Sequence, residues 1–282
     1  MTGFGVRSSV APLRRVAVRA PALGSDFARA HWEQPVDEVL LLEQHAAFVR
    51  LLRHLGCTVD ELPADAALPD SCFVYDPVFV AGDGAIVLRA AKDVRAGEPA
   101  QLARDLEALG VPIIGALQGD ATADGGDMCF LDASTLAVGR SYRTNDDAIE
   151  QIQRLLAPQG IEVRVFTVPH DRGPEYCMHL MSVISPVRDD LAVVYERLAP
   201  EGLLAELQDR GIAWVNVPDA EYATLGCNVL AIKPGLVVLA EGNDETAMAL
   251  RARAVHVHLY AASELNKGEG GPTCLTRPLL RS

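Results

Sequence analysis

The sequence lacks long hydrophobic runs and has few basic residues relative to acidic ones. No apolar run approaches the roughly 18 residues that a membrane-spanning helix needs, so we expect no association with a membrane. Lys and Arg number 25 against 38 Asp and Glu, which gives a formal net charge of −13 at pH 7. Phosphate binding requires a basic face, so this balance argues against a nucleic-acid partner.

The sequence also lacks paired cysteines. Its six cysteines form no CxxC pair, which disfavours a zinc ribbon or a thioredoxin-type site. Five of them lie in apolar stretches, where a free cysteine behaves as a small core residue, so we expect a reduced, cytoplasmic protein. Residues 1–15 hold no apolar segment of the kind found in secretory signals, and we expect residues 1–13 to form a loose tail.

No stretch rich in Pro, Gly and Ser divides the chain, so we expect a single domain over residues 1–282. Hydrophobic residues make up 49% of the sequence and charged residues 22%. These shares are typical of a globular protein and not of a disordered one. A homodimer is compatible with this composition.

A unit of about 50 residues recurs along the chain, and a repeat of this length decides the architecture. In each unit an amphipathic helix is followed by a short β segment and then by two β-rich runs joined by a turn. The helices are expected over residues 36–55, 99–109, 146–156, 201–210 and 244–253. The first of them ends at Gly56, a typical C-terminal stop.

The last β-rich run, residues 274–280, has no partner at the C-terminal end of the chain. The N-terminal run RRVAVRA, residues 14–20, could pair with it and close a ring. Such closure removes exposed sheet edges. We therefore expect an α/β protein built as one closed ring of five units. The alternative is an ordinary α/β sandwich whose regular spacing arises by chance.

Five polar segments interrupt apolar strands with groups that would be costly to bury without a use. They are residues 69–77, 123–128, 141–145, 177–182 and 268–274. In a ring, each segment falls at the start of a strand or at the end of a hairpin. We therefore expect all five to face one central cavity.

One cysteine, Cys274, follows Gly268, Gly270 and Gly271 and so differs from the other five. Glycine lets the backbone approach a ligand closely, which a packed strand does not need. A nucleophilic cysteine reacts as a thiolate in a partly open setting, and His179 is the natural general acid and base for it. Each residue taken alone is also compatible with inert packing.

Acidic and basic residues complete the candidate site. Asp124 and Asp127 flank two glycines, and Asp70 and Asp76 flank an apolar strand. Carboxylates accept the planar N–H fork of a guanidinium in a bidentate way, so a guanidinium is the expected ligand. Two arginines could then clamp an α-carboxylate, or could simply lie at the surface: Arg89 and Arg143.

A metal site receives little support. His256 and His258 alternate along one strand and face the same side, but no third ligand accompanies them. We interpret both histidines as structural and expect neither a metal nor an organic cofactor.

An ordered set of motifs resembles the guanidine-modifying enzymes of the pentein, or amidinotransferase, superfamily. The set comprises DGGD at 124–127, the arginine of GRSYRTN, His179-Leu180 and Thr273-Cys274. The chain is most similar to the dimethylarginine dimethylaminohydrolase family over nearly its whole length. The resemblance implies a closed five-fold pseudosymmetric αββαβ propeller, the pentein fold, in agreement with the repeat.

The resemblance also implies a role for each candidate residue. Cys274 would be the nucleophile, His179 the acid and base, and Asp124 the acid that orients the histidine and the substrate. Asp76 would accept the guanidinium, Asp70 would contact the amino-acid end, and Arg89 and Arg143 would bind the carboxylate. The full set of expected substrate-binding residues is Asp70, Asp76, Arg89, Arg143, Asp127 and Gly268.

The implied reaction is hydrolysis of a methylated L-arginine to L-citrulline and an alkylamine through a covalent thiouronium on Cys274. Two departures leave alternatives. Tyr75 stands where the family usually carries Glu, and GEGGPTC (268–274) is closer to arginine deiminases. The alternatives are an arginine deiminase, an amidinotransferase, and a catalytically silent arginine-binding protein.

Two features distinguish the chain from the deiminases. Leu180-Met181 follow the histidine, where deiminases place an Asp two residues after it, and the chain is short for a deiminase. The aromatic face of Tyr75 can hold a cation and tolerates methyl groups. This favours a methylated substrate over free arginine.

Overall fold

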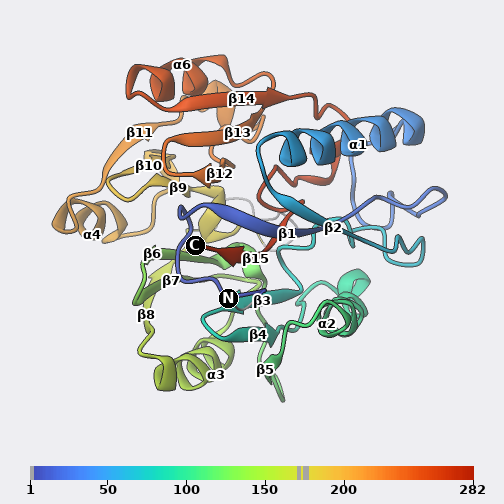
Figure 1. The fold of residues 1–282 in the computed structure, drawn as a ribbon, viewed down its shortest axis with the longest axis horizontal. Helices are drawn as coiled ribbons and strands as arrows, with labels where there is room; N and C mark the ends of the chain where they lie inside the picture. Colours follow the sequence, from blue (N-terminus) through green and yellow to red (C-terminus); the bar gives the residue numbers. More distant parts are fainter. Residues whose placement is uncertain (1–2, 170–172, 174–177) are drawn as a thin grey trace.

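The structure is a computed structural model that describes residues 3–169, 173 and 178–282. Cys177, which belongs to one of the polar segments above, lies outside these residues. Within the described residues the strands form five separate sheets of three strands each. Figure 1 shows the sheets arranged around a centre, with the long helices on the periphery.

In each sheet the middle strand pairs antiparallel with one neighbour and parallel with the other. The first sheet joins β15 (Arg277–Arg281), β1 (Leu13–Arg19) and β2 (Thr58–Leu62). The second joins β3 (Val78–Ala81), β4 (Gly84–Val87) and β5 (Ile113–Ala116), and the third β6 (Met128–Asp132), β7 (Thr135–Arg140) and β8 (Glu162–Thr167). The fourth joins β9 (Ile184–Arg188), β10 (Leu191–Val194) and β11 (Ala213–Asn216), and the fifth β12 (Leu230–Lys233), β13 (Leu236–Ala240) and β14 (His256–Tyr260).

A helix connects the second and third strands of every sheet, because two parallel strands cannot be joined by a tight turn. These helices are α1 (Glu38–His54), α2 (Glu98–Ala108), α3 (Asp146–Leu156), α4 (Leu203–Asp209) and α6 (Asp244–Ala252), and a short α5 (Asp219–Tyr222) precedes β12. No helix formed by the described residues is long and apolar enough to cross a bilayer. The predicted repeat of helix, strand and hairpin is confirmed.

The sequence of α1 explains its bounds and its orientation. Asp37 caps its first turn by accepting hydrogen bonds from the backbone N–H groups of Val39 and Leu40. The helix stops where Gly56 adopts a φ of 93°, which favours glycine. Its buried stripe packs on the sheet below and consists of Leu41, Gln44, His45, Phe48, Val49 and Leu52.

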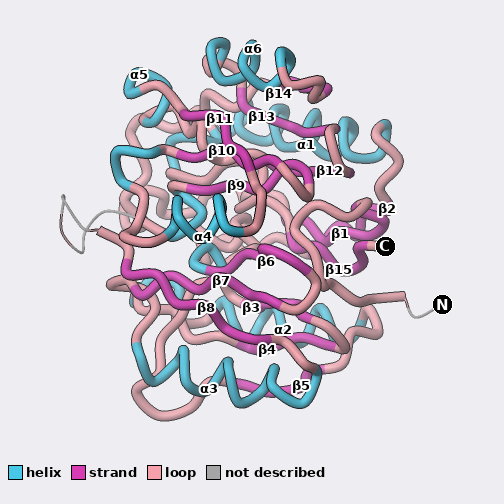
Figure 2. The backbone as a smooth tube through the Cα atoms, turned by 90° about the vertical axis from the view of Figure 1, so that its left-hand side faces the viewer, coloured by secondary structure: helices cyan, strands magenta, loops and turns pink. Residues whose placement is uncertain are grey.

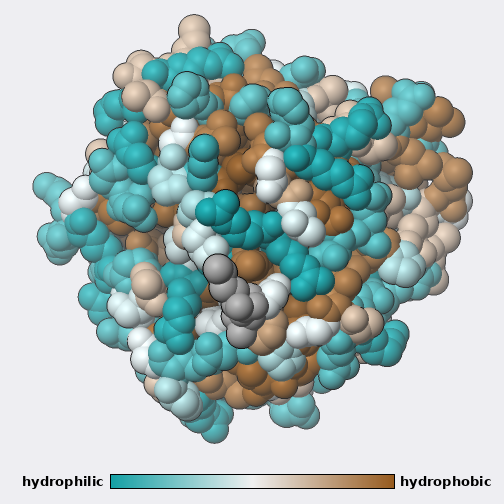
Figure 3. All heavy atoms as spheres, in the orientation of Figure 1, coloured by the Kyte–Doolittle hydropathy of each residue, from teal (hydrophilic) through white to brown (hydrophobic). Residues whose placement is uncertain are grey.

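The first strands of the five sheets surround the centre of the ring. They are β15, β3, β6, β9 and β12, and β12 contacts β9, β9 contacts β6, and β15 contacts β3. We call them the inner strands. The rim of the molecule in the same orientation is largely hydrophilic (Figure 3), as a net charge of −13 implies.

The ring is closed by the two ends of the chain. β1 pairs antiparallel with β15, with Leu13 opposite Arg281 and Val16 opposite Pro278. The predicted pairing of residues 14–20 with 274–280 is therefore confirmed, except that β15 begins at Arg277. Cys274 lies in the turn just before this strand.

The N-terminal segment differs from its prediction as a loose tail. Val6 and Val10 are buried, the N–H of Gly5 donates to the carbonyl of Leu279 at 2.7 Å, and the N–H of Gly82 donates to the carbonyl of Val6 at 2.7 Å. The segment is held because its valines leave water and its backbone extends the hydrogen-bonding of the ring. The start of the described chain and β15 near its C-terminus lie on the same side of the molecule (Figure 2).

We expect a circular permutant to fold, because the two ends of the chain already meet. A short Gly-Ser linker from Ser282 to Gly3, with new termini between the exposed Asp189 and Asp190, leaves every inner strand in place. Thermal unfolding followed by circular dichroism should show a cooperative transition within about 10 °C of the original chain.

The matched control is the original chain without residues 277–282, which removes β15. It should lose the cooperative transition. A permutant that fails to fold while the truncated chain folds would contradict a closed ring.

Candidate active site

A cavity of about 220 Å³ opens at one end of the ring. It brings together all of the residues predicted for the site except Arg89 and Asp127. The residues that meet there are Asp70, Asp76, Asp124, Arg143, His179, Gly268 and Cys274. Since these positions are spread along the chain, the ring alone accounts for their proximity.

The cavity has a simple relation to the repeat. A polar residue that lines it stands shortly before each inner strand: Cys274 before β15, Asp76 before β3, Asp124 before β6, His179 before β9 and Asn228 before β12. In a closed ring, all five inner strands begin at the same end of the molecule. The residue before each strand therefore points to the common axis.

His179 and Asp124 form a buried pair. Nε2 of His179 lies 3.1 Å from Oδ2 of Asp124, and both side chains are almost fully buried. The imidazole packs closely against Gly126, where an added Cβ would come within 2.4 Å of Nδ1 of His179. Glycine at this position is therefore required by the close approach of the ring.

Asp127 supports this pair and does not line the cavity, which corrects its prediction as a substrate-binding residue. One of its oxygens accepts a hydrogen bond from the N–H of Leu180 at 2.8 Å. The other accepts from the hydroxyls of Ser141 at 2.6 Å and Thr144 at 2.7 Å. Burial raises the pKa of Asp127 to about 6. Its carboxyl holds together the segments that carry His179 and the loop after β7.

Asp76 is engaged on both oxygens. It accepts a hydrogen bond from the N–H of Gly126 at 2.9 Å and another from Nη1 of Arg95 at 2.7 Å. Burial opposes ionisation of this carboxyl, but Arg95 and His179 lower the pKa of Asp76 below its usual value. Arg95 lines the cavity and was not predicted from the sequence.

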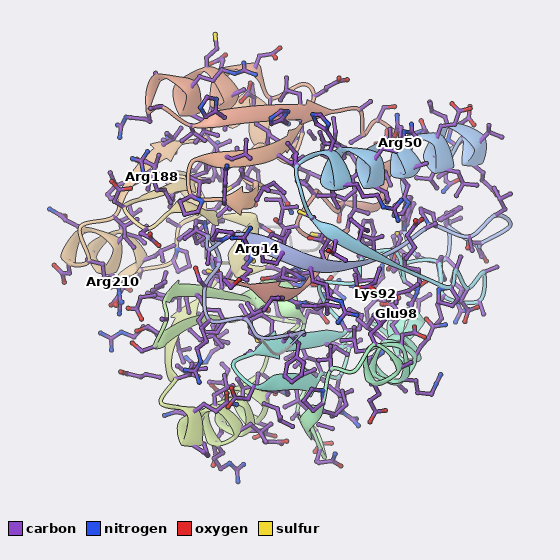
Figure 4. The ribbon with its side chains drawn as sticks, in the orientation of Figure 1. Arg14, Arg50, Lys92, Glu98, Arg188 and Arg210 are labelled. Atoms are coloured by element: carbon purple, nitrogen blue, oxygen red, sulfur yellow. The ribbon has the colours of Figure 1, made fainter. Side chains whose placement is uncertain are left out.

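Glu98 lies behind Arg95 and is fully buried. Its Oε2 accepts a hydrogen bond from Nε of Arg95 at 2.8 Å, whereas Oε1 has no partner among the described residues. Burial raises the pKa of Glu98 to about 8, although Arg95 opposes this rise. Glu98 and Lys92 come from the first turn of α2 and the segment leading into it (Figure 4).

Asp70 forms an ion pair with a different basic side chain, that of Lys92. Its Oδ1 accepts a hydrogen bond from Nε1 of Trp32 at 2.7 Å, and its Oδ2 lies 2.7 Å from Nζ of Lys92. Lys92 also donates to the carbonyl of Ala30 at 2.7 Å. Three of the four acidic residues that line the cavity, Asp70, Asp76 and Asp124, thus have a basic partner: Lys92, Arg95 or His179. The fourth, Glu269, is exposed.

The two arginines predicted to clamp a carboxylate have different positions. Arg143 is buried and lines the cavity, and its guanidinium bonds to none of the described residues. Arg89 is exposed and outside the lining, which corrects its predicted role. The reason is strand parity: Leu88 is buried, and the next side chain of an extended backbone points the other way.

Cys274 is held by a residue that the sequence did not reveal. Nδ2 of Asn228 lies 3.3 Å from Sγ of Cys274, and Oδ1 of Asn228 accepts the N–H of Thr273 at 3.0 Å. Gly271 makes room for this amide, because an added Cβ would lie 2.6 Å from Cγ of Asn228. The amide thereby fixes both the thiol and the backbone before it.

Accessibility also distinguishes Cys274. It is the one partly exposed cysteine among those described, and the other four are buried. Burial raises the pKa of Cys57 to about 11 and that of Cys129 to about 12. Neither thiol is therefore suited to act as a nucleophile near neutral pH.

One aromatic face of Tyr75, which the sequence suggested as a surface for a cationic ligand, is covered by a cation of the protein itself. Its hydroxyl donates to the carbonyl of Met128 at 3.2 Å. The guanidinium carbon of Arg277 lies 4.0 Å from the centre of its ring, so a cation of the protein already covers this face. Tyr75 is part of the cavity wall and separates the cavity from Arg277.

The arrangement places an accessible thiol, a paired imidazole and several carboxylates around one small space. These groups can perform nucleophilic attack, proton transfer and recognition of a cation. No cluster of three or more metal-ligating side chains occurs among the described residues.

Comparison with known proteins gives consistent matches. The family model of eukaryotic N,N-dimethylarginine dimethylhydrolase matches residues 16–281. The uncharacterized protein YkgA of Bacillus subtilis is 30% identical over 85% of this chain and 80% of its own length. An arginine deiminase of Rhodococcus erythropolis is 28% identical over 80% of this chain and 68% of its own length.

The N(G),N(G)-dimethylarginine dimethylaminohydrolase of Pseudomonas aeruginosa is 24% identical over 93% of this chain and 98% of its own length. The structure of the Pseudomonas enzyme, as a cysteine-to-serine mutant in complex with citrulline, superimposes with a TM-score of 0.78 at 21% identity. The match covers 94% of this chain and 99% of that one. The expected five-fold α/β propeller is thus confirmed.

The raised pKa of Glu98 makes a prediction about stability. The folded protein holds a proton on Glu98 that the unfolded chain releases near pH 4.5, so stability falls as pH rises from about 4.5 to about 8. Glu98→Gln removes this titration. Between pH 6 and pH 8, the unfolding free energy of the original protein should fall by roughly 2 kcal/mol more than that of the variant.

Urea unfolding at a series of pH values measures this difference, and other titrating groups cancel because both proteins share them. Glu107→Gln, at an exposed acid of the same helix, is the control and should follow the original protein at every pH. Identical pH profiles for Glu98→Gln and Glu107→Gln would show that Glu98 titrates in its ordinary range.

Proposed function

The chain belongs to the N,N-dimethylarginine dimethylhydrolase family, and from this membership we propose that it hydrolyses dimethylarginine or monomethylarginine to L-citrulline and an alkylamine. The chain is a hydrolase that acts on the C–N bonds of the guanidino group of arginine derivatives. The observation that supports the proposal is the convergence of Cys274, His179, Asp124 and Asp76 on one cavity.

In the first half-reaction the thiolate of Cys274 attacks the central carbon of the guanidinium. A C–S bond forms, and the C–N bond to the methylated nitrogen breaks. His179 gives its proton to the departing alkylamine. The product on the enzyme is a thiouronium joined to Cys274, and His179 is now neutral.

In the second half-reaction the neutral His179 takes a proton from a water molecule. The hydroxide attacks the same carbon and gives a neutral tetrahedral intermediate. The C–S bond breaks, the thiolate of Cys274 leaves, and the new hydroxyl group releases its proton to water as the C=O bond forms. The released ureido product is citrulline. Asp124 keeps the imidazole oriented in both steps, because it lies 3.1 Å from Nε2 of His179.

Different residues of the cavity can bind the two ends of such a substrate. Asp76 and Asp124 can accept the N–H groups of the guanidinium, and Asp70 the α-ammonium. Arg143 can bind the α-carboxylate, because its guanidinium has no partner among the described residues. Before the substrate arrives, Lys92 forms an ion pair with Asp70, and Arg95 with Asp76.

Tyr75 supports a methylated substrate for a reason other than its aromatic face. The family's usual Glu would accept N–H groups at the guanidinium end, whereas the hydroxyl of Tyr75 is committed to Met128. A free NH₂ group at this wall would lose a partner, which is costly in a buried site. A dimethylated nitrogen has no N–H to lose.

Free arginine is the second candidate substrate, and ammonia would then be the leaving group. The glycine-rich segment 268–274 and the similarity to arginine deiminases favour it. The test is kcat/KM for dimethylarginine, monomethylarginine and arginine, with citrulline, alkylamine and ammonia measured separately. A higher value for arginine would refute the methylated substrate, and absence of citrulline from all three would refute the reaction.

Cys274→Ser should lower turnover by about 10⁴-fold or more while the protein stays folded, because a hydroxyl is a much weaker nucleophile at neutral pH. Cys129→Ala is the matched control: it removes a fully buried thiol outside the cavity and should retain turnover with a lower unfolding temperature. The measurement is citrulline formation by purified, folded variants. Turnover by Cys274→Ser at the original rate would exclude Cys274 as the nucleophile.

Arg143→Met should lower kcat/KM by about 10–100-fold through loss of a charged hydrogen bond to the α-carboxylate. Arg89→Met, at an exposed arginine outside the cavity, should change it less than about twofold. A methylated guanidine without a carboxylate should react equally slowly with both variants and the original protein. Equal effects of the two substitutions would contradict the assignment of Arg143.

A further inference from the structure

A second, smaller cavity lies on the other side of Tyr75 from the candidate active site, between the N-terminal segment and the inner strands. Its volume of about 20 Å³ is enough for about one small ion or water molecule. The polar side chains that line it are those of Ser8, Ser9, Tyr75, Thr273, Arg277 and Arg281. We call it the axial cavity.

Arg277 is buried beside this cavity and is only partly satisfied. Its Nη1 donates to the carbonyls of Tyr75 and Val78, both at 2.9 Å. Its Nε has no hydrogen-bond partner among the described residues, and the side chain is 1% exposed. An N–H donor of a buried cation without an acceptor is costly, so a missing acceptor is expected near it.

Arg281, on the same strand, adds a second buried charge. It donates to the carbonyls of Ala11 at 2.6 Å and Ala231 at 2.8 Å. No carboxylate among the described residues lies within ion-pair distance of Arg277 or Arg281. Burial, together with the charge of Arg277, lowers the pKa of Arg281 to about 10. The two arginines are therefore short of negative charge.

The other deeply buried arginines show what is missing. Arg19 pairs with Asp105, and Arg95 with Asp76. Nε of Arg19 also lacks a hydrogen-bond partner among the described residues, so the difference lies in the missing carboxylate. Burial of a charge without a counter-ion is expensive, and proteins normally avoid it. Arg277 and Arg281 thus depart from the pattern that the same chain follows elsewhere.

The N-terminal segment contributes further donors to the axial cavity. Oγ of Ser9 accepts the N–H of Phe130 at 2.8 Å, and Oγ of Ser8 accepts the N–H groups of Val10 and Ala11. Because these oxygens already accept, each hydroxyl has its proton left to donate. The polar groups around the cavity are thus mainly donors.

We propose that the axial cavity binds a monovalent anion of halide size, held by Nε of Arg277 and the serine hydroxyls and balancing the charges of Arg277 and Arg281. A water molecule could accept from Nε but would leave two buried positive charges uncompensated. The volume excludes phosphate or a carboxylic acid. Chloride is the anion of this size that a protein meets in solution.

Diffraction from crystals of the full chain grown in sodium bromide tests the site directly. Bromide should give an anomalous difference peak within about 3.5 Å of Nε of Arg277. A density peak there without anomalous signal would identify a water molecule and overturn the proposal. This experiment needs no variant, so it does not depend on how a substitution affects folding.

Thermal unfolding provides the second test. At constant ionic strength, replacing gluconate, which is too large for the cavity, with chloride should raise the unfolding temperature by about 3 °C. Arg277→Met should abolish this rise. Arg19→Met, which removes an equally buried arginine with a carboxylate partner, should retain it. An equal chloride effect in both variants would mean that chloride acts elsewhere.

Discussion

The antiparallel pairing of β1 with β15 is the constraint on which the active site depends. The other sheets each form from one continuous stretch of chain, whereas this sheet joins residues 13–62 to residues 277–281. Bringing such distant segments together has a high entropic cost. Burial of Val16, Val18 and Leu279 offsets it. Since Cys274 lies in the turn before β15, the thiol reaches the cavity only when the ring has closed.

Charge balance is the second constraint. Three buried carboxylates, those of Asp70, Asp76 and Asp124, line one small space, and burial of an unpaired charge is costly. Each of them has a basic partner: Lys92, Arg95 or His179. A cation that enters this space meets carboxylates that are already paired, and at Asp76 it would have to share the carboxylate with Arg95. Glu98 modulates this sharing, because it holds the other edge of Arg95.

Much of this architecture follows from the sequence because it rests on local patterns. Helices stop at glycines, hairpins show alternating runs, and a repeat of about 50 residues implies a ring. Two expectations from the sequence differ from the structure. Arg89 points outward because side chains alternate along an extended backbone. One face of Tyr75 is covered by Arg277, which lies 202 positions away and which no local pattern could indicate.

Asn228 was missed for a different reason. It stands alone in an apolar stretch, so no motif marks it. The repeat nevertheless contains the signal: in four units a reactive or charged residue comes shortly before the inner strand, and Asn228 occupies that place in the fifth. A ring that directs every such position to its axis makes a solitary polar residue there a candidate by symmetry alone.

Tyr75 links the two cavities electrostatically. Tyr75 lines both cavities and lies between the candidate active site and the positive charge of Arg277. Uncompensated, Arg277 and Arg281 would repel a cationic substrate through a wall of low dielectric constant, where charges act strongly on one another. An anion in the axial cavity would cancel much of this repulsion. The position of Tyr75 and the burial of two arginines are then parts of the same electrostatic arrangement.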